Sequence, residues 1–198
     1  VRGTFFTTGE VARKFPDTIR AVVTAGHELG CHGDWHRDFT TLGADEARQE
    51  LRDASATLRA FGPVTSFRAP YLRFPQAGLP WLVEHGYTLD SSQARYKGGP
   101  HHRADAPVPA GLRRVPASTT SSVLRLPRWL RQPVLDALAT PVVLFVHPWE
   151  FVDFRDSDLR LDCRFRTGQP ALDCVGAVLD RFLERGFTFR TMAKLSEQ

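Results

Sequence analysis

Short apolar runs alternate along this chain with longer stretches in which apolar residues recur at helical spacing. Apolar, β-branched or aromatic runs predict buried strands at residues 2–6, 28–31, 64–67, 86–89, 112–116, 142–146 and 187–190. Amphipathic spacing predicts helices at residues 16–25, 44–61, 80–85, 130–138 (interrupted by Pro133) and 171–185. Because strands and helices alternate, the pattern predicts an α/β fold with a parallel sheet or barrel.

Four of these predicted strands run directly into a residue type that carries chemistry. The side chains in question belong to His32, Arg68, Asp90 and His147. Parallel α/β folds collect their functional groups at the carboxyl ends of the strands. We therefore expect these four side chains to converge on one rim.

The segment His32-Gly33-Asp34-Trp35-His36 places two imidazoles next to one strand end. Neutral imidazole binds zinc and its first-row neighbours, and two imidazoles with one carboxylate leave positions open for water and substrate. Asp34 could supply that carboxylate, but its position between the two histidines favours a turn or helix-cap role. The segment predicts a metal site built on His32 and His36.

Composition favours one soluble domain. The chain has 198 residues, 42% hydrophobic and 24% charged, with no run of eighteen apolar residues and no signal-peptide pattern. Its net charge is +4, but the basic residues are scattered along the chain, so nucleic acid is not an expected partner. Cys31 is expected in the core, while Cys163 and Cys174 are either bridged or free.

Two long segments without periodicity, residues 93–111 and 150–170, are expected to be lids, binding edges or disordered loops. His101 and His102 lie in the first and are interpreted as solvent-exposed. His27 and His85 stand beside glycines at predicted helix ends, and no catalytic role is assigned to them.

Four motifs in order along the chain, at residues 2–6, 26–36, 67–71 and 144–150, resemble the polysaccharide deacetylase family with the NodB homology domain, similar to carbohydrate esterase family 4. The match covers nearly the whole chain. The continuation Pro148-Trp149-Glu150 resembles the branch with peptidoglycan-deacetylase-like and allantoinase-like proteins.

The resemblance implies a distorted (β/α) barrel with a divalent metal ion, zinc, held by His32 and His36. The family's third ligand and catalytic base are two aspartates on a first strand, which would precede Val1. We therefore expect residues 1–198 to be a single catalytic domain that is N-terminally incomplete, because a barrel without its first strand exposes unpaired edges. The other explanation is a relative that lacks those aspartates.

The resemblance also implies roles for five further residues. Arg68 orients the base, the backbone N–H at Tyr71 stabilises the oxyanion, and His147 is the general acid. Asp90 is expected to hold the other nitrogen of the His147 imidazole. Trp149 is a candidate stacking face for a sugar.

These roles predict a hydrolase that removes N-acetyl groups from amino sugars or polysaccharide. Two alternatives stay open: an allantoinase-like hydrolase of small or cyclic amides with the same fold, and a catalytically inactive carbohydrate-binding relative. The expected partner is an N-acylated sugar or a small amide. The sequence indicates neither an oligomeric state nor a localisation.

Overall fold

The computed structural model describes residues 1–102 and 106–196 and divides the chain into two compact units. Unit 1 comprises the described residues of Val1–Pro116 and Phe189–Gln198, and unit 2 is Ala117–Thr188. We describe each unit by itself, and the expectation of a single domain stays a prediction.

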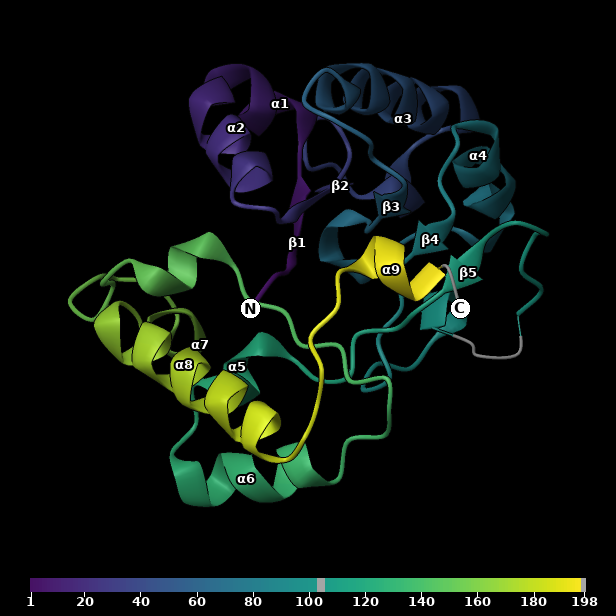
Figure 1. Ribbon diagram of the computed structural model, residues 1–198. Coiled ribbons are helices and arrows are strands. Elements are labelled where there is room, and N and C mark those ends of the chain that lie inside the picture. The colour runs from purple at the N-terminus through teal and green to yellow at the C-terminus, as the bar shows by residue number, and fades with distance from the viewer. Residues whose placement is uncertain (103–105, 197–198) are drawn as a thin grey trace. The chain divides into compact units, whose positions relative to one another are not determined.

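Unit 1 contains a parallel sheet whose strands pair in chain order (Figure 1). Every neighbouring pair is parallel, and the strands are β1 (Thr4–Thr7), β2 (Glu28–Cys31), β3 (Ser66–Phe67), β4 (Leu89–Asp90) and β5 (Arg113–Arg114). Parallel neighbours need a crossover segment, and helices supply most of those here. The predicted α/β fold with a parallel sheet is confirmed.

The helices of unit 1 include every one predicted for it, at nearly the predicted positions. They are α1 (Gly9–Lys14), α2 (Pro16–Thr24), α3 (Ala44–Arg59), α4 (Leu79–Glu84) and α9 (Met192–Ser196), with short 3-10 turns at η1 (Phe39–Thr41), η2 (Pro70–Leu72), η3 (Gln76–Gly78) and η4 (Pro100–His102). The pattern missed α1, which begins after Thr8, whose hydroxyl accepts a hydrogen bond from the Val11 N–H at 3.3 Å.

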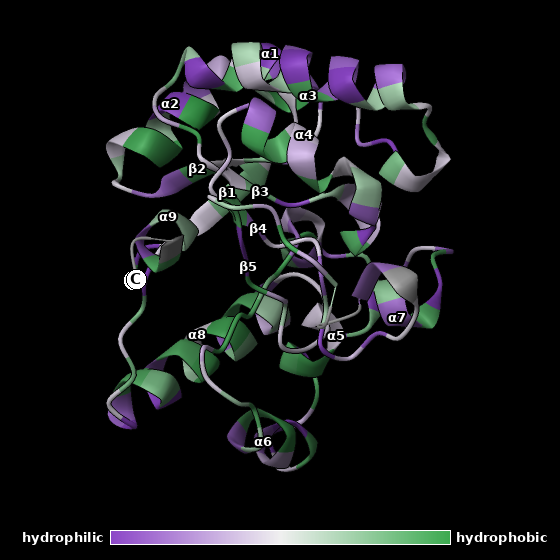
Figure 2. Ribbon diagram, turned by 90° about the vertical axis from the view of Figure 1, so that its right-hand side faces the viewer, coloured by the Kyte–Doolittle hydropathy of each residue, from purple (hydrophilic) through white to green (hydrophobic). Residues whose placement is uncertain are grey.

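The long helix α3 shows why this segment folds as it does. Ala47, Leu51, Ala54 and Leu58 are buried on one side, at spacings of three and four residues. Hydrophilic and hydrophobic stretches alternate along the helix (Figure 2). The carboxylate of Glu46 accepts the Gly43 N–H at 3.2 Å and so caps the first turn.

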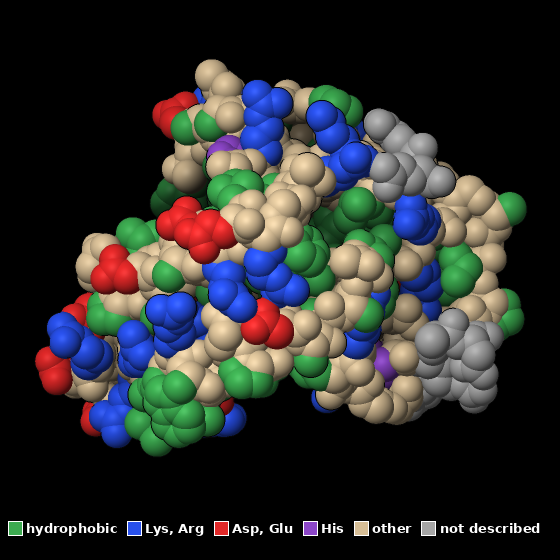
Figure 3. Space-filling model, turned by 60° about the horizontal axis from the view of Figure 1, so that its bottom comes forward, with side chains coloured by type: hydrophobic (Ala, Val, Ile, Leu, Met, Phe, Trp, Pro, Cys, Tyr) green, Lys and Arg blue, Asp and Glu red, His purple; other side chains and the backbone are tan. Residues whose placement is uncertain are grey.

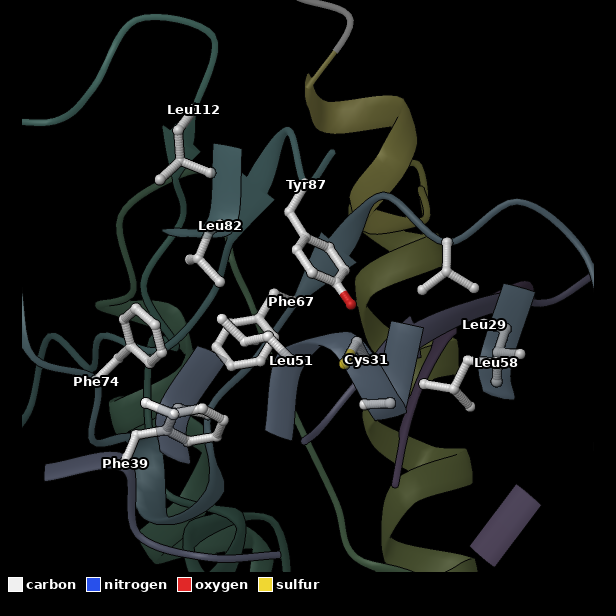
Figure 4. Close-up of a cluster of buried hydrophobic side chains, with 14 of the residues drawn as sticks. Leu29, Cys31, Phe39, Leu51, Leu58, Phe67, Phe74, Leu82, Tyr87 and Leu112 are labelled. Atoms are coloured by element: carbon white, nitrogen blue, oxygen red, sulfur yellow. The ribbon is translucent and has the colours of Figure 1, made fainter. Parts of the chain in front are cut away.

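The core of unit 1 is built on aromatic side chains around Phe67 of β3 (Figure 4). Its ring centroid lies 5.6 Å from Phe39, 5.1 Å from Phe74 and 5.6 Å from Tyr87, in tilted or edge-to-face arrangements. The hydroxyl of Tyr87 is 2.6 Å from that of Ser55. Because this cluster lies directly behind the strand ends, it holds β3 in place beside β2 and β4.

Cys31 belongs to the same core, as predicted. Burial raises the pKa of its thiol to about 11, so the thiol is neutral near pH 7. Cys163 and Cys174 of unit 2 are both free thiols, which settles the alternative left open by the sequence.

Unit 2 is helical. It contains α5 (Ser121–Leu124), α6 (Arg128–Asp136), the 3-10 turn η5 (Pro148–Phe151), α7 (Leu161–Arg164) and α8 (Gln169–Glu184). In α8, Ala171, Cys174, Val178 and Phe182 form the buried side. Pro133 lies inside α6 without ending it, so the predicted interruption is wrong. The predicted loop 150–170 contains the short helix α7.

Two predicted strands are not formed. Residues 142–146 are irregular: the Val143 N–H donates to the Ser118 hydroxyl at 2.9 Å, and a side-chain acceptor cannot continue a strand ladder. Residues 187–190 are also irregular, because the Phe187 N–H donates to the Phe182 carbonyl at 2.9 Å and closes the end of α8. Gly186, with φ +79°, makes this helix end possible.

Across residues 1–102 and 106–196, no helix combines the length and the apolar character that crossing a membrane requires. On the face shown in Figure 3, Lys and Arg side chains are interspersed with acidic, hydrophobic and other residues. The absence of a nucleic-acid partner stays a prediction. Residues 103–105 of the predicted loop 93–111 lie outside the described residues.

We expect Phe67→Ala to lower the free energy of unfolding by about 3–5 kcal/mol, because it removes a fully buried ring from the centre of the core. Urea denaturation followed by circular dichroism measures the change. Phe15→Ala is the matched control, since Phe15 is 58% exposed and its loss should change stability by less than about 0.5 kcal/mol. Equal effects of the two substitutions would contradict this description of the core.

Candidate active site

Three of the four predicted strand-end residues lie together at one edge of the sheet in unit 1. His32 follows β2, Arg68 follows β3, and Asp90 is the last residue of β4. These strands are parallel neighbours, so their carboxyl ends meet at the same edge. His147 belongs to unit 2 and follows the irregular residues 142–146, so it does not follow a strand.

The imidazole of His32 is fixed by the backbone of the neighbouring strand end. Its Nδ1 lies 2.6 Å from the carbonyl oxygen of Arg68. Because a carbonyl oxygen can only accept a hydrogen bond, Nδ1 carries the proton and Nε2 carries the lone pair. This is the tautomer and the backbone hydrogen bond found in histidines that bind metals through Nε2.

His36 and Tyr71 form an aromatic row with His32. The ring centroids of His32 and His36 are 5.0 Å apart, and those of His36 and Tyr71 are 5.1 Å apart. His36, Tyr71 and Leu72 all have positive φ, at 54°, 59° and 56°. Left-handed backbone costs a non-glycine residue about 1–2 kcal/mol, so the surrounding contacts must hold these three residues in place.

Asp34 is engaged away from the two histidines. Its carboxylate accepts two hydrogen bonds from the Arg13 guanidinium, at 2.7 and 2.8 Å, and its side chain is almost fully buried. A Cβ at Gly9 would lie 1.9 Å from Asp34 Oδ1, so only glycine permits this approach at the start of α1. The structure therefore supports the turn interpretation of Asp34 and not the metal-ligand alternative.

Glu50 of α3 hydrogen-bonds to the backbone of the segment between His32 and His36. One of its carboxylate oxygens accepts the N–H of Asp34 at 2.9 Å and that of Trp35 at 3.1 Å. The residue is buried, and these two N–H groups have no strand or helix partner. Glu50 therefore holds the backbone between the two histidines.

Arg68 is a buried cation, 8% exposed, and not part of a surface ion pair. Its guanidinium donates to the Ser91 carbonyl at 3.2 Å and to the Ser91 hydroxyl at 2.8 Å, and its Cζ lies 4.5 Å from the centre of the Phe6 ring. Burial lowers the pKa of Arg68 to about 10, although the charge of Asp90 opposes the shift. Arg68 therefore remains a cation near pH 7.

Asp90 has different partners from the one predicted. Its carboxylate forms an ion pair with Arg114 Nε at 2.8 Å and accepts the Ser92 N–H at 2.9 Å. Both Asp90 and Arg114 are buried in unit 1. These contacts make Asp90 the link between the ends of β4 and β5.

Within unit 2 the carboxylate that contacts the His147 imidazole is Glu150, while the expected pairing with Asp90 of unit 1 stays a prediction. Glu150 Oε1 lies 2.9 Å from His147 Nδ1 and also accepts the His147 N–H at 2.9 Å. Its other oxygen lies 2.9 Å from Arg125 Nε. Burial alone would raise the pKa of Glu150, but the hydrogen bonds from His147 and Ser121 and the charge of Arg125 lower it overall.

The His147 imidazole is also held between aromatic rings. It stacks on Trp149 with the centroids 5.6 Å apart and the planes at 20°, and it makes an edge contact with Phe145 at 5.5 Å. Arg125 Cζ lies 5.6 Å from the Trp149 ring. Trp149 therefore packs on His147. Its role as a stacking face for a sugar stays a prediction.

The prediction from sequence missed two supporting residues, Glu50 and Glu150, although each left a signal. Glu50 lies at the apolar spacing of Ala47, Leu51 and Ala54, where a carboxylate is unexpected unless it is hydrogen-bonded. Glu150 follows His147 by three residues, within reach of the preceding backbone N–H at the start of a helical turn.

The two imidazoles of unit 1 fit the role of paired metal ligands. The His32 lone pair is on Nε2, and the centroids of the His32 and His36 rings are 5.0 Å apart. In the part of the chain that the structure describes, no group of three or more His, Cys, Asp or Glu could hold a metal ion. His32 and His36 are therefore candidate ligands only.

Comparison with known proteins supports this description of the fold. Residues 1–89, which include both histidines and Arg68, match the polysaccharide deacetylase family. Peptidoglycan-N-acetylglucosamine deacetylase of Bacillus cereus is 31% identical over 91 residues, which are 45% of this chain and 33% of that protein. The chain therefore spans about a third of the length of this relative.

Solved structures resemble the chain over a much longer range. A peptidoglycan N-acetylglucosamine deacetylase has a TM-score of 0.67 at 18% identity, covering 98% of this chain and 74% of that one. A family 4 pseudoenzyme from Bacillus anthracis has a TM-score of 0.64 at 16% identity, covering 99% and 56%. At such identities the likeness shows the fold alone.

The fold and the strand-end histidines define an α/β protein of the class that carries its functional groups at the carboxyl edge of a parallel sheet. The match to the polysaccharide deacetylase family covers the first 89 of the chain's 198 residues.

We expect Glu50→Ala to destabilise unit 1, because it leaves the buried N–H of Asp34 without an acceptor, at a cost of about 1–3 kcal/mol, and also removes the acceptor of the part-buried Trp35 N–H. Urea denaturation measures the free energy of unfolding. Asp45→Ala removes an exposed carboxylate from the same helix and should leave stability unchanged. A Glu50→Ala protein as stable as Asp45→Ala would refute the proposed support.

We expect Glu150→Gln to lower the free energy of unfolding by about 3–5 kcal/mol, because it leaves the Arg125 charge buried without a carboxylate. Asp153→Asn is the control: Asp153 also pairs with an arginine in unit 2, but the pair is exposed, so stability should not change. The same urea titration compares the two variants. If both variants match the wild type, the Arg125 pair does not stabilise unit 2.

Proposed function

We propose that this chain is a hydrolase that removes the acyl group from N-acylated amino sugars by breaking the amide C–N bond. The observation that carries the proposal is the pair His32 and His36 at the end of β2, with the His32 ring oriented by the Arg68 carbonyl at 2.6 Å. Its relatives add support, since the one from Bacillus cereus is named as a deacetylase of peptidoglycan N-acetylglucosamine.

His32 would bind a divalent metal ion through Nε2, and His36 would be its second ligand. When bound, such an ion, for which we propose zinc, supplies Lewis acidity toward the amide carbonyl and makes a water molecule more acidic. The Arg68 carbonyl keeps the His32 proton on Nδ1 and so keeps Nε2 able to bind. Glu50 and Asp34 keep the connecting backbone in one conformation.

Arg68 would act through its charge. A buried guanidinium that stays protonated near pH 7 would keep the carboxylate of a catalytic base ionised. It would also stabilise the negative charge that develops at the reacting carbonyl. Asp90 would position the strand ends through its ion pair with Arg114. The backbone N–H of Tyr71, held in left-handed conformation, is the proposed donor to the oxyanion.

His147 would be the general acid that protonates the leaving amine. The Glu150 carboxylate accepts a hydrogen bond from the Nδ1–H group of His147. The other ring nitrogen, Nε2, would therefore be the one that gives a proton to the substrate. The same hydrogen bond and the stacked Trp149 ring keep the imidazole in one orientation. This arrangement matches the role of the carboxylate partner of histidine in acid-base catalysis.

The proposed substrate class is N-acetylated sugar or polysaccharide, and Trp149 is a proposed stacking surface for the sugar ring. The alternatives, a hydrolase of small amides and an inactive carbohydrate-binding relative, become outcomes of the following test.

We expect the protein that carries residues 1–198, together with the two aspartates expected before Val1, to release acetate from N-acetylglucosamine oligomers in the presence of zinc. Both a chelator and His32→Ala should abolish the release, because each removes the metal. His147→Ala should lower kcat by about 10²–10⁴-fold, the usual contribution of a general acid. An enzymatic acetate assay measures each rate, and circular dichroism checks that the variants fold.

His101→Gln is the control, since this histidine lies outside the proposed machinery and its loss should leave the rate unchanged. Release of acetate that is unaffected by a chelator would contradict the metal-dependent mechanism. Hydrolysis of small amides without acetate release from oligomers would favour the amidohydrolase, and oligomer binding without any hydrolysis would favour the inactive relative.

A further inference from the structure

Trp35 is a large aromatic residue that the reaction proposed above does not use. It lies between Asp34 and His36 in the segment that carries both candidate ligands, and 56% of its surface is exposed. Tryptophan is on average well buried, because a large indole surface is costly to leave in water. An exposed indole beside a candidate catalytic group therefore requires a specific explanation.

The position of the indole is set by a chain of contacts that begins in α1. Arg13 Cζ lies 5.3 Å from the centre of the Trp35 ring, within the range of a cation–π interaction. The same guanidinium is held by the Asp34 carboxylate at 2.7 and 2.8 Å and by the Thr57 hydroxyl at 3.1 Å. Arg13 thus supports the indole from a fixed position.

The backbone of Trp35 is also fixed by contacts. Its N–H donates to the buried Glu50 carboxylate at 3.1 Å, and the next residue, His36, has its φ set at 54°. An aromatic side chain that is ordered before a ligand arrives loses little conformational entropy on binding. This degree of support is more than an incidental surface residue needs.

The chemistry of an exposed, ordered indole suits a sugar ring. The C–H groups on one face of a pyranose are apolar and carry a small positive charge, and the face of an aromatic ring is negative. Contact between the two faces buries apolar surface on both sides and leaves the sugar hydroxyls in water. Trp35 directly precedes His36 in the segment that follows β2, so its backbone lies within one residue of a candidate metal ligand.

We propose that Trp35 is the stacking platform of a sugar subsite, which binds a pyranose ring of the N-acylated glycan beside His32 and His36. The proposal rests on the function proposed above and adds a specificity residue to it. Arg13 and Glu50 position the platform, and Trp35 itself makes the contact.

Titration calorimetry of the full chain with the tetramer of N-acetylglucosamine, in the presence of a chelator, tests the proposal without any turnover. We expect Trp35→Ala to weaken binding about tenfold, as the loss of one aromatic contact does, and Trp35→Phe to keep most of the affinity. Trp129→Ala is the matched control, because Trp129 is a still more exposed indole, on α6 of unit 2, and its loss should not change Kd.

Urea denaturation of the same variants shows whether the loss of affinity reflects unfolding. Equal Kd values for the wild type and Trp35→Ala, or no binding of the tetramer by the wild type, would overturn the proposal. The acetate assay separates the two proposals. Binding that depends on Trp35 without acetate release would reject only the deacetylase function, while acetate release with an unchanged KM in Trp35→Ala would reject only the subsite.

Discussion

The hydrogen bond between His32 Nδ1 and the Arg68 carbonyl joins the ends of β2 and β3 and leaves the lone pair of the His32 ring on Nε2. It can form only because the two strands are parallel neighbours, with Cys31 opposite Phe67 in register. The aromatic core behind Phe67 holds that register, so the packing of the core and the orientation of the imidazole depend on each other.

Three buried carboxylates hold the segments around the candidate site. Each accepts hydrogen bonds from the backbone or from a neighbouring side chain. Glu50 accepts two N–H groups between the histidines, Asp34 fixes Arg13, and Glu150 fixes His147. Buried charge is costly unless it is paired, so these residues also make the conformations of the two units specific. The ordered indole of Trp35 is a consequence of the first two contacts.

Much of the fold was predictable because local sequence controls it. The apolar spacing of α3, the proline at the start of α2 and the alternation of strands with helices all follow from short-range rules. Residues 142–146 and 187–190 have the composition of strands but not the structure, because strand formation also requires a hydrogen-bonding partner along the whole segment. Composition cannot supply that partner.

The amino-acid sequence was enough to predict the parallel α/β fold, to indicate the resemblance to polysaccharide deacetylases over the first 89 residues, and to propose His32, His36, Arg68 and His147 as candidate site residues. The pairings of the acidic side chains became visible in the folded units alone: Glu150 contacts His147, Asp34 pairs with Arg13, and Glu50 supports the histidine segment. The physical reason is that motif and periodicity are local along the chain, whereas most of these pairings join residues far apart in sequence and depend on how the folded elements pack.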